Sequence, residues 1–344
     1  MKYLSIGVPS YNSEGYLIQC IDSLLVGGED VEIIIINDGS TDKTLEIARD
    51  YQKKYPSIVK VVDQENMGHG EGVNQGLAHS TGLYYKVVDS DDHLLKNGYL
   101  KLLKTIKEHL KEGLSPDAYI CNFVYDHAID GTKNVSSYDK HIKPNAFVDW
   151  NRITKMHFSK MILMHSLIFR RDILIESGVI LPKHCFYVDN YFAYKPLIIS
   201  KIVYYLDVDL YSYFIGRSDQ SINITNFSKR YNQQLIVMNL MIDAIKYEDI
   251  KKLPRWKRNY LKHALNVVNI VTIAFIVLGD RNLKEQFNDV KRHFESIKAK
   301  DKKMYYFLRY RSYYTVVPWF IFKYLKKKII HYGYNQTCKK AKVG

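Results

Sequence analysis

The sequence predicts an α/β fold of the Rossmann-like kind, a mostly parallel central sheet flanked by helices, with a helical C-terminal extension. In the first third of the chain, short β-branched runs alternate with segments of helical periodicity, which is the pattern of βαβ units. The run from Val31 to Asn37 is continuously apolar, as expected for a strand covered on both faces. After about Asn226 the apolar residues keep helical spacing, which indicates helices.

The boundaries follow from breaks in these patterns. The predicted strands cover residues 4–8, 31–37, 58–63, 83–88, 118–125, 201–206 and 210–214. The predicted helices cover residues 15–25, 42–55, 72–80, 97–112, 168–177, 231–247, 256–278, 283–299 and 315–330. Asn12 or Ser13 is expected to cap the first helix and Ser40 or Thr41 the second. We therefore expect one domain over residues 1–225 and a helical region over 226–344.

Composition excludes several classes of protein. With 344 residues and 47% hydrophobic content, the chain can bury a large core, so disorder is not expected. The four cysteines are scattered without CxxC pairs, which argues against a disulfide framework or a zinc cluster and fits a reducing compartment. We expect neither a secretory signal nor a transmembrane segment, because the apolar runs are short.

Polar loops follow three of the predicted strands. They are Val8 to Asn12, Asn37 to Asp42, and Asp89 to Asp92. In an open α/β sheet the carboxyl ends of parallel strands share one edge, where ligands bind. We therefore expect these loops to meet in space.

The third loop, Asp-Ser-Asp-Asp, places three carboxylates within four residues. Such carboxylates repel one another unless a cation lies among them, and oxygen ligands suit Mg²⁺ or Mn²⁺ carrying a diphosphate. The alternative is a solvated turn or a helix cap. The position after a buried strand, in register with two other polar loops, favours the metal site.

Taken in order, VPSYN, NDGSTD, ENMGHGEGVNQGL and DSDD resemble the motifs of the inverting family 2 glycosyltransferases, which have the GT-A fold. The resemblance covers about the first 225 residues and implies a nucleotide-sugar donor with Mn²⁺ or Mg²⁺ as cofactor. It implies that Asp38 hydrogen-bonds the nucleobase, Asp89 the ribose, and Asp91 the metal. The residues that it assigns to the nucleotide are Pro9, Tyr11, Asn12, Asp38, Asn66, Gly68, Asn74, Asp89 and Ser90.

The sequence departs from the family at one position of its glycine-rich segment. The family usually has an arginine before Asn74, and here the residue is Val73. One contact to the nucleotide is therefore absent or comes from elsewhere. A dinucleotide-binding interpretation of Gly68 to Gly72 is weaker, because that fingerprint follows the first strand and Glu71 would repel a pyrophosphate.

An inverting transfer needs a base for the acceptor hydroxyl. Asp189 is the candidate, since Phe186 to Asn190 resembles the family's acidic-Asp-Asn segment with Val188 in place of the first acid. A helix cap is the alternative for Asp189, and both roles are compatible. By resemblance, Asp92, His165 and Asn190 are assigned to donor or acceptor, although His165 could equally be a buried core imidazole.

Arg217 follows an aromatic strand in a segment that resembles the family's loop over the diphosphate. A guanidinium group suits bidentate contact with phosphate, and we predict this role for Arg217. A solvated surface arginine is the alternative.

The charge of the chain is concentrated at its C-terminal end. Between Lys298 and Gly344 there are thirteen basic residues and one acid, Asp301, interleaved with tyrosine, phenylalanine and tryptophan. This mixture is typical of segments that lie on anionic membranes. Ordinary core aromatics are the alternative, and no nucleic-acid-binding motif accompanies the charge. We expect a cytoplasmic enzyme, peripheral on the inner face of the cell membrane, whose oligomeric state is left open.

The interpretation favoured by the sequence is a metal-dependent inverting transferase that moves a hexosyl or aminohexosyl group from a UDP-sugar. A dTDP-sugar is the less favoured interpretation of the donor. Its acceptor would be a surface glycan or a lipid-linked saccharide. One alternative is a non-catalytic module of the same fold that binds a nucleotide sugar or a glycan. A sugar-nucleotide pyrophosphorylase is disfavoured, because its glycine-rich signature should stand where VPSYN is found.

Overall fold

The computed structural model describes residues 1–127, 130–150, 153, 156, 160–216, 229–278 and 282–311. The chain divides into two compact units, Met1–Ile153 with Ile162–Gly216, and Thr154–Met161 with Arg217–Gly344. The predicted boundary between residues 225 and 226 lies outside the described residues and stays a prediction.

A mixed sheet forms the centre of the first unit. Its strands are β1 (Leu4–Ser10), β2 (Val31–Asp38), β3 (Val59–Gln64), β4 (Tyr84–Val87), β5 (His93–Leu94), β6 (Ala118–His127), β7 (Lys133–Ser136), β8 (Ala146–Asp149), β9 (Leu167–Arg170) and β10 (Ile202–Ile215). They run in the order β3-β2-β1-β4-β9-β6-β10-β5, with β7 beside β6 and β8 beside β10.

The order of the strands brings the predicted loops to one edge. β1 pairs in parallel with both β2 and β4, and β2 pairs in parallel with β3. The chain therefore leaves β1, β2 and β4 at the same side of the sheet, where the polar loops begin. β9 runs antiparallel between β4 and β6, so the sheet is mixed rather than purely parallel.

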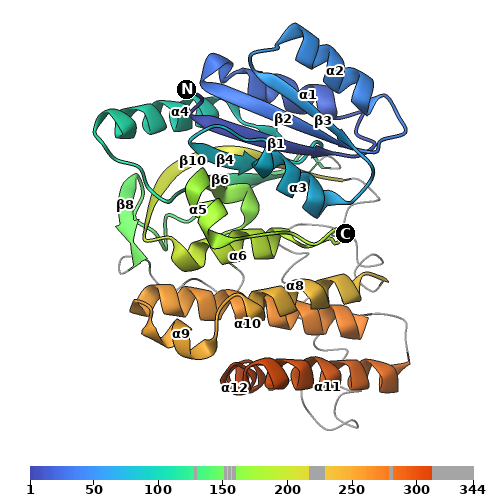
Figure 1. The fold of residues 1–344 in the computed structure, drawn as a ribbon. Helices are drawn as coiled ribbons and strands as arrows, with labels where there is room; N and C mark the ends of the chain where they lie inside the picture. Colours follow the sequence, from blue (N-terminus) through green and yellow to red (C-terminus); the bar gives the residue numbers. More distant parts are fainter. Residues whose placement is uncertain are drawn as a thin grey trace. The chain divides into compact units, whose positions relative to one another are not determined.

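Helices cover both faces of this sheet (Figure 1). They are α1 (Leu17–Leu25), α2 (Thr44–Lys54), α3 (His69–Ala78), α4 (Lys96–Lys111), α5 (Arg171–Ser177) and α6 (Asp189–Ile199), with 3-10 turns η1 (Gly28–Asp30) and η3 (Met164–Ser166). Figure 1 shows α1, α2 and α4 on one face and α3, α5 and α6 on the other. A hydrophobic core cluster lies between the sheet and the first three helices, so the predicted α/β class is confirmed.

Three local predictions are wrong. Residues 168–177 are not one helix, because β9 occupies the first part and α5 begins only at Arg171. The two strands predicted at 201–206 and 210–214 form one strand, β10, with register shifts between Tyr205 and Tyr211. Side-chain caps are absent from α1 and α2, whose N-cap residues are Tyr16 and Lys43. The predicted caps contact neighbouring loops instead.

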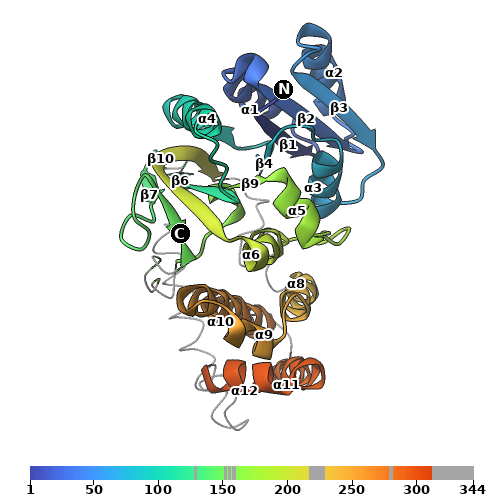
Figure 2. The same ribbon diagram turned by 60° about the vertical axis from the view of Figure 1, so that its left-hand side comes forward.

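The second unit is helical, as predicted. Its described helices are α8 (Tyr231–Asp243), α9 (Tyr247–Lys252), α10 (Arg255–Leu278), α11 (Leu283–Lys300) and α12 (Lys302–Arg311). α10 packs against the other four helices (Figure 2). The predicted helix 231–247 ends at Asp243, and the predicted helix 315–330 lies outside the described residues.

One helix of the described residues, Arg255–Val277, is long and apolar enough to cross a membrane. Core helices of globular proteins pass the same test, and 61% of its most apolar window is buried. The expectation that the chain has no transmembrane segment is therefore left as a prediction. Three cysteines of the described residues, Cys20, Cys121 and Cys185, are free and buried.

Candidate active site

The three polar loops meet, as predicted. The Asn12 side-chain oxygen accepts a hydrogen bond from the Thr41 amide at 2.9 Å, which joins the loop after β1 to the loop after β2. The Ser13 and Ser90 hydroxyl groups are 2.7 Å apart, which joins the loop after β1 to the acidic loop after β4. Asn12 has a positive φ of 48°, a conformation that asparagine tolerates better than most residues.

Asp38, at the end of β2, holds the glycine-rich segment in place. Its side chain is 4% exposed and accepts hydrogen bonds from the amides of Met67 and Gly68, each at 2.8 Å. It also accepts a bond from the Gln64 side chain at 2.7 Å. The predicted contact of Asp38 with a nucleobase stays a prediction, and a carboxylate has further acceptor sites for it.

His69 joins the glycine-rich segment to the acidic loop. Its ring nitrogen Nε2 lies 2.7 Å from Asp89 Oδ1. Burial lowers the pKa of His69, but Asp89, Asp189 and Asp91 raise it by more, so the pKa ends above its ordinary value. Burial raises the pKa of Asp89, but His69, His165 and Lys86 lower it by more, so this pKa ends below its ordinary value. Both shifts favour the charged forms, so the two side chains form an ion pair when His69 is protonated, and His69 then donates.

Asp189 belongs to the same electrostatic cluster. It is the first residue of α6, without a side-chain cap, and burial raises its pKa to about 6 against the lowering effect of His69. Asp89 contributes to this rise, as neighbouring like charges do. The predicted base and the predicted ribose ligand therefore lie close enough to affect each other's ionisation, although about a hundred residues separate them in sequence.

Asp92 is the last residue of the acidic loop. It is 2% exposed, and it accepts hydrogen bonds from the Tyr211 hydroxyl at 2.5 Å and the Phe214 amide at 2.8 Å. Burial, Asp91 and Asp89 raise its pKa above the ordinary value. These contacts anchor the acidic loop to β10, and the predicted contact of Asp92 with donor or acceptor stays a prediction.

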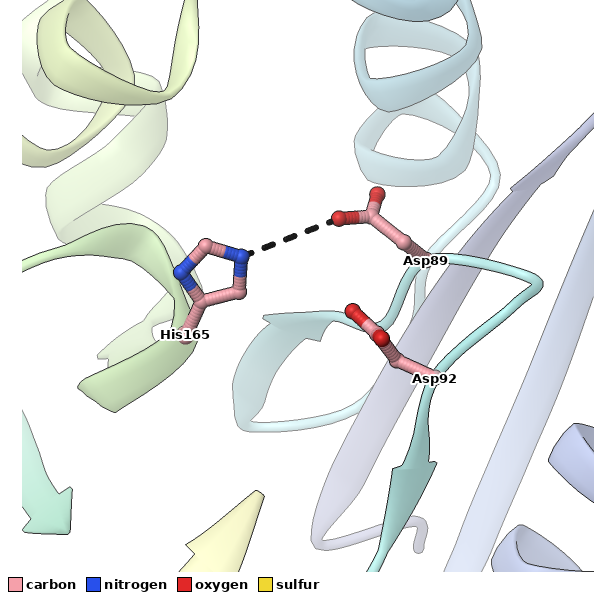
Figure 3. Close-up of side chains that lie close together, drawn as sticks. All are labelled: Asp89, Asp92 and His165. Carbon is pink, nitrogen blue, oxygen red and sulfur yellow. Dashed lines mark ion pairs between the residues drawn. The ribbon is translucent and has the colours of Figure 1, made fainter. Parts of the chain in front are cut away.

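Asp89, Asp92 and His165 form a group that could hold a metal ion, since one ligand atom from each lies within 4.8 Å of the others. Figure 3 shows the His165 ring and the Asp89 carboxylate pointing toward each other, with Asp92 beside them. The nitrogen Nε2 of His165 is 3.9 Å from Asp89 Oδ2, and burial lowers the pKa of His165 to about 4, which leaves the ring neutral. Two carboxylates and a neutral imidazole suit Mn²⁺, so these residues fit a divalent cation. Asp91, the predicted ligand, is half-buried in the same loop.

Lys86, which the sequence interpretation did not weigh, lies beneath this group on β4. It is completely buried, donates a hydrogen bond to the His165 carbonyl at 2.8 Å, and lies 4.9 Å from the centre of the Tyr211 ring. Burial lowers its pKa to about 8. The signal in the sequence was a single lysine within the otherwise apolar strand Tyr84 to Val88. His69 was missed because it was considered only as part of a glycine-rich run.

The other predicted residues have mainly structural contacts in the described residues. Asn74 bonds to both the amide and the carbonyl of Leu181, at 3.0 and 2.9 Å. Pro9 is buried, whereas Tyr11 is 52% exposed and Asn66 is exposed. Asn190 donates weakly to Asp189 at 3.4 Å. Arg217 lies outside the described residues. The nucleotide or sugar contacts of all of these stay predictions.

Two hollows lie elsewhere on the first unit, at the border of α4 and β10. Val208 lines both of them. Neither is lined by a predicted site residue, so neither bears on the site described above. The candidate site is defined by the convergence of its side chains.

Comparison with known proteins agrees with this geometry. The model of the family "Glycosyl transferase family 2" matches residues 5–169, which include β1 to β9 and the acidic loop. Glycosyltransferase GlyA of Streptococcus pneumoniae is 27% identical over 223 residues, 63% of this chain and 31% of GlyA. Poly(ribitol-phosphate) beta-glucosyltransferase of Bacillus spizizenii is 38% identical over 111 residues, 31% of this chain and 17% of that protein. The chain thus spans about a third or less of these relatives.

Among solved structures, TarS of Staphylococcus aureus, residues 1–349 in complex with UDP-GlcNAc, has a similar fold. The TM-score is 0.65 at 20% identity, and the match covers 95% of this chain and 91% of that one. The predicted GT-A fold with a helical C-terminal region is thereby confirmed.

Proposed function

We propose that this chain is a family 2 glycosyltransferase, since the model of that family matches residues 5–169, and that it transfers a sugar from a UDP-sugar to a hydroxyl group of a surface-glycan or lipid-linked saccharide. The observation that supports this most is the cluster of Asp89, His69 and Asp189 beside the segment held by Asp38. The names of two similar proteins also support it, since one acts on poly(ribitol-phosphate) and the other was crystallised with UDP-GlcNAc.

The reaction is a single displacement with inversion. Asp189 takes the proton of the acceptor hydroxyl group as its oxygen attacks the anomeric carbon of the donor. The bond from that carbon to the diphosphate oxygen breaks on the opposite face, and the nucleoside diphosphate leaves with the electron pair. A pKa of about 6 leaves Asp189 ionised at neutral pH and still basic enough to accept the proton.

A divalent cation, Mn²⁺ or Mg²⁺, is the proposed cofactor. Asp91, with the neighbouring group of Asp89, Asp92 and His165, would hold it. When bound, the ion neutralises negative charge on the leaving diphosphate. His69 and Lys86 both lower the pKa of Asp89, so their positive charge, when they carry it, limits the repulsion within the acidic loop.

The remaining roles are assigned by position. Tyr11, exposed at the end of β1, and Asp38 are the proposed contacts of the nucleobase, while Asn12, Asn66, Gly68, Asn74 and Ser90 border the nucleotide. Asn190, next to the base, faces donor or acceptor, and Arg217 is the proposed phosphate contact.

A panel of nucleotide sugars tests the proposal. The purified chain is incubated with each sugar, Mn²⁺ and a lipid-linked saccharide acceptor, and release of nucleoside diphosphate is measured. We expect release from a UDP-sugar that stops when a chelator removes the metal. If no sugar on the panel is turned over although UDP binds, the chain is the non-catalytic binding module instead.

We further propose that the chain is cytoplasmic and binds the inner face of the cell membrane through its basic C-terminal region. α12 supports this, because Lys302, Tyr306, Arg309 and Tyr310 are exposed within one arc of the helix. Met304, Tyr305 and Leu308 are buried on the other side. Exposed cations and tyrosines on one face suit an anionic lipid surface.

Co-sedimentation with vesicles tests this surface. We expect the chain to bind phosphatidylglycerol vesicles and to bind phosphatidylcholine vesicles at least tenfold more weakly. The double change Lys302→Glu and Arg309→Glu should weaken binding to the anionic vesicles. Equal binding by the variant would show that α12 is not part of the membrane surface.

A further inference from the structure

Lys86 is a buried cation at a place where the fold could hold an apolar residue. It lies on β4, where all four residues are buried, and its own side chain is 0% exposed. Among the described residues no carboxylate oxygen lies within 4.0 Å of its ammonium group, so no direct ion pair compensates its burial there. An ammonium group buried in this way is costly unless the structure uses its charge or its hydrogen bonds.

The two contacts of Lys86 reach both sides of the candidate metal group. On one side its ammonium group donates to the backbone carbonyl of His165, in the turn η3 that carries the imidazole. On the other side it lies over the Tyr211 ring, 4.9 Å from its centre. Tyr211 in turn donates to Asp92 and accepts a hydrogen bond from the Asp89 amide at 3.2 Å. Lys86 therefore contacts the backbone of His165 directly, and it contacts the Tyr211 ring, whose hydroxyl group bonds to both Asp92 and Asp89.

Aromatic contacts also join the His165 ring to two tyrosines of β10. The His165 ring centre is 5.0 Å from that of Tyr211 and 4.7 Å from that of Tyr213. The imidazole therefore has little room to turn, and its position depends on the backbone that Lys86 holds. A substitution at Lys86 would release the turn and the Tyr211 ring together.

We propose that Lys86 is a positioning residue for the Asp89, Asp92 and His165 group: its ammonium group aligns the three side chains, and its charge opposes an incoming divalent cation. The inference rests on the proposed use of a metal. The positive charge stabilises the carboxylates before the cation arrives and weakens the affinity for that cation. Lys86 thus weakens the affinity for the cation while it aligns the three side chains. Removing it should strengthen metal binding and disturb the alignment, and these two effects can be measured separately.

The test compares substitutions that remove or keep the charge. Lys86→Met and Lys86→Gln remove it, and Lys86→Arg keeps it. Glu32→Gln is the matched control, because Glu32 is also a buried charged residue of this sheet but contacts none of the three group members. Binding of Mn²⁺ is measured on the full chain without donor, from the electron paramagnetic resonance signal of the free ion, after circular dichroism confirms folding.

We expect the two neutral variants to bind Mn²⁺ at least threefold more tightly than the unchanged chain, with Lys86→Arg and Glu32→Gln within twofold of it. With a UDP-sugar that the chain turns over, kcat of the neutral variants should fall at least tenfold, while KM for the donor changes by less than twofold. A purely structural role would not give tighter metal binding with slower turnover.

Two results would overturn the inference in different ways. If the unchanged chain binds Mn²⁺ and the neutral variants bind it equally or more weakly, Lys86 does not oppose the cation, and the proposed function is untouched. If the unchanged chain binds no Mn²⁺, the proposed metal is wrong and the role of Lys86 is rejected with it.

Discussion

Among single residues, the acids of the first unit have different environments and therefore different roles. Asp189 is half-buried, and its pKa is raised to about 6 in the vicinity of Asp89 and His69, which suits a base near neutral pH. Asp38 has its oxygens bonded to the backbone of Met67 and Gly68, which suits a residue that shapes a loop. The sequence could identify both because each follows a recognisable motif. It could not show that His69 contacts Asp89 of the acidic loop, or that Lys86 contacts His165 and Tyr211 beside that loop, because those contacts depend on the fold.

The role of Asp189 predicts a pH dependence. A base accepts a proton only when ionised, so kcat/KM should rise with pH and reach half its maximum near the pKa of about 6. Asp189→Asn should lower kcat by about 10²- to 10⁴-fold and leave UDP affinity unchanged. Glu176→Gln, which changes an exposed acid on α5, is the control. Near-normal turnover in the Asp189 variant would remove this residue from the mechanism.

Glu32, on β2, has a structural role. It is 1% exposed and accepts hydrogen bonds from the Ser5 hydroxyl and the Lys60 ammonium group, both at 2.6 Å. Burial raises its pKa, but these bonds and those from Thr81 lower it to about 2. Because the folded-state pKa lies below the unfolded value, the stabilisation is complete above pH 4.5 and is lost as the pH falls toward 2.

Glu32→Gln should therefore lower the free energy of unfolding at pH 7 by about 3 kcal/mol, as measured by urea denaturation. The difference from the unchanged chain should shrink as the pH falls from 4.5 toward 2. Glu29→Gln is the control, since the Glu29 side chain is 72% exposed. A difference that stays constant with pH would contradict the assignment.

At the scale of elements, the sequence predicts best where one pattern persists. β1, β2 and α10 were found close to their predicted bounds, because each has a long apolar run or a regular helical period. The segment from 168 to 177 was mistaken for a helix because Ile168 to Arg170 carries too few residues to show the period of a strand. The pairing of β9 with both β4 and β6 decides its structure, and no local pattern contains that information.

The glycine-rich start of α3 depends on one close contact. Gly68 has a φ of +85°, and a Cβ atom there would lie 2.8 Å from the backbone of His184. Gly113, with a φ of +72°, has open space at the same position. Both glycines allow a backbone conformation that costs other residues about 1–2 kcal/mol. Only at Gly68 would a side chain also collide with a neighbouring backbone, that of His184.

We therefore expect Gly113→Ala to lower stability by about 1 kcal/mol and to leave nucleotide binding intact. Gly68→Ala should lower stability further and weaken UDP binding at least tenfold, because the segment between Asp38 and His69 must move. Thermal unfolding and calorimetric titration with UDP measure the two effects. Equal behaviour of the two variants would show that the contact with His184 is unimportant.

For the whole molecule, the central claim is that segments far apart in sequence form one nucleotide site at the edge of the sheet. Bonds from Asn12 to Thr41 and from Ser13 to Ser90 join the three loops, and His69 joins the glycine-rich segment to Asp89. The order of motifs made this convergence predictable, because parallel strands end at a common edge. The identity of the donor sugar and the acceptor could not be predicted, since one fold serves many specificities.

The most direct test is calorimetric titration of UDP in the presence and absence of Mn²⁺. The unchanged chain should bind UDP more tightly than GDP or ADP, and Mn²⁺ should strengthen UDP binding. In Asp91→Asn the strengthening by Mn²⁺ should disappear, and in Asp38→Asn the preference for UDP should be lost. Binding of UDP that is the same in both variants as in the unchanged chain would contradict a nucleotide site built from these carboxylates.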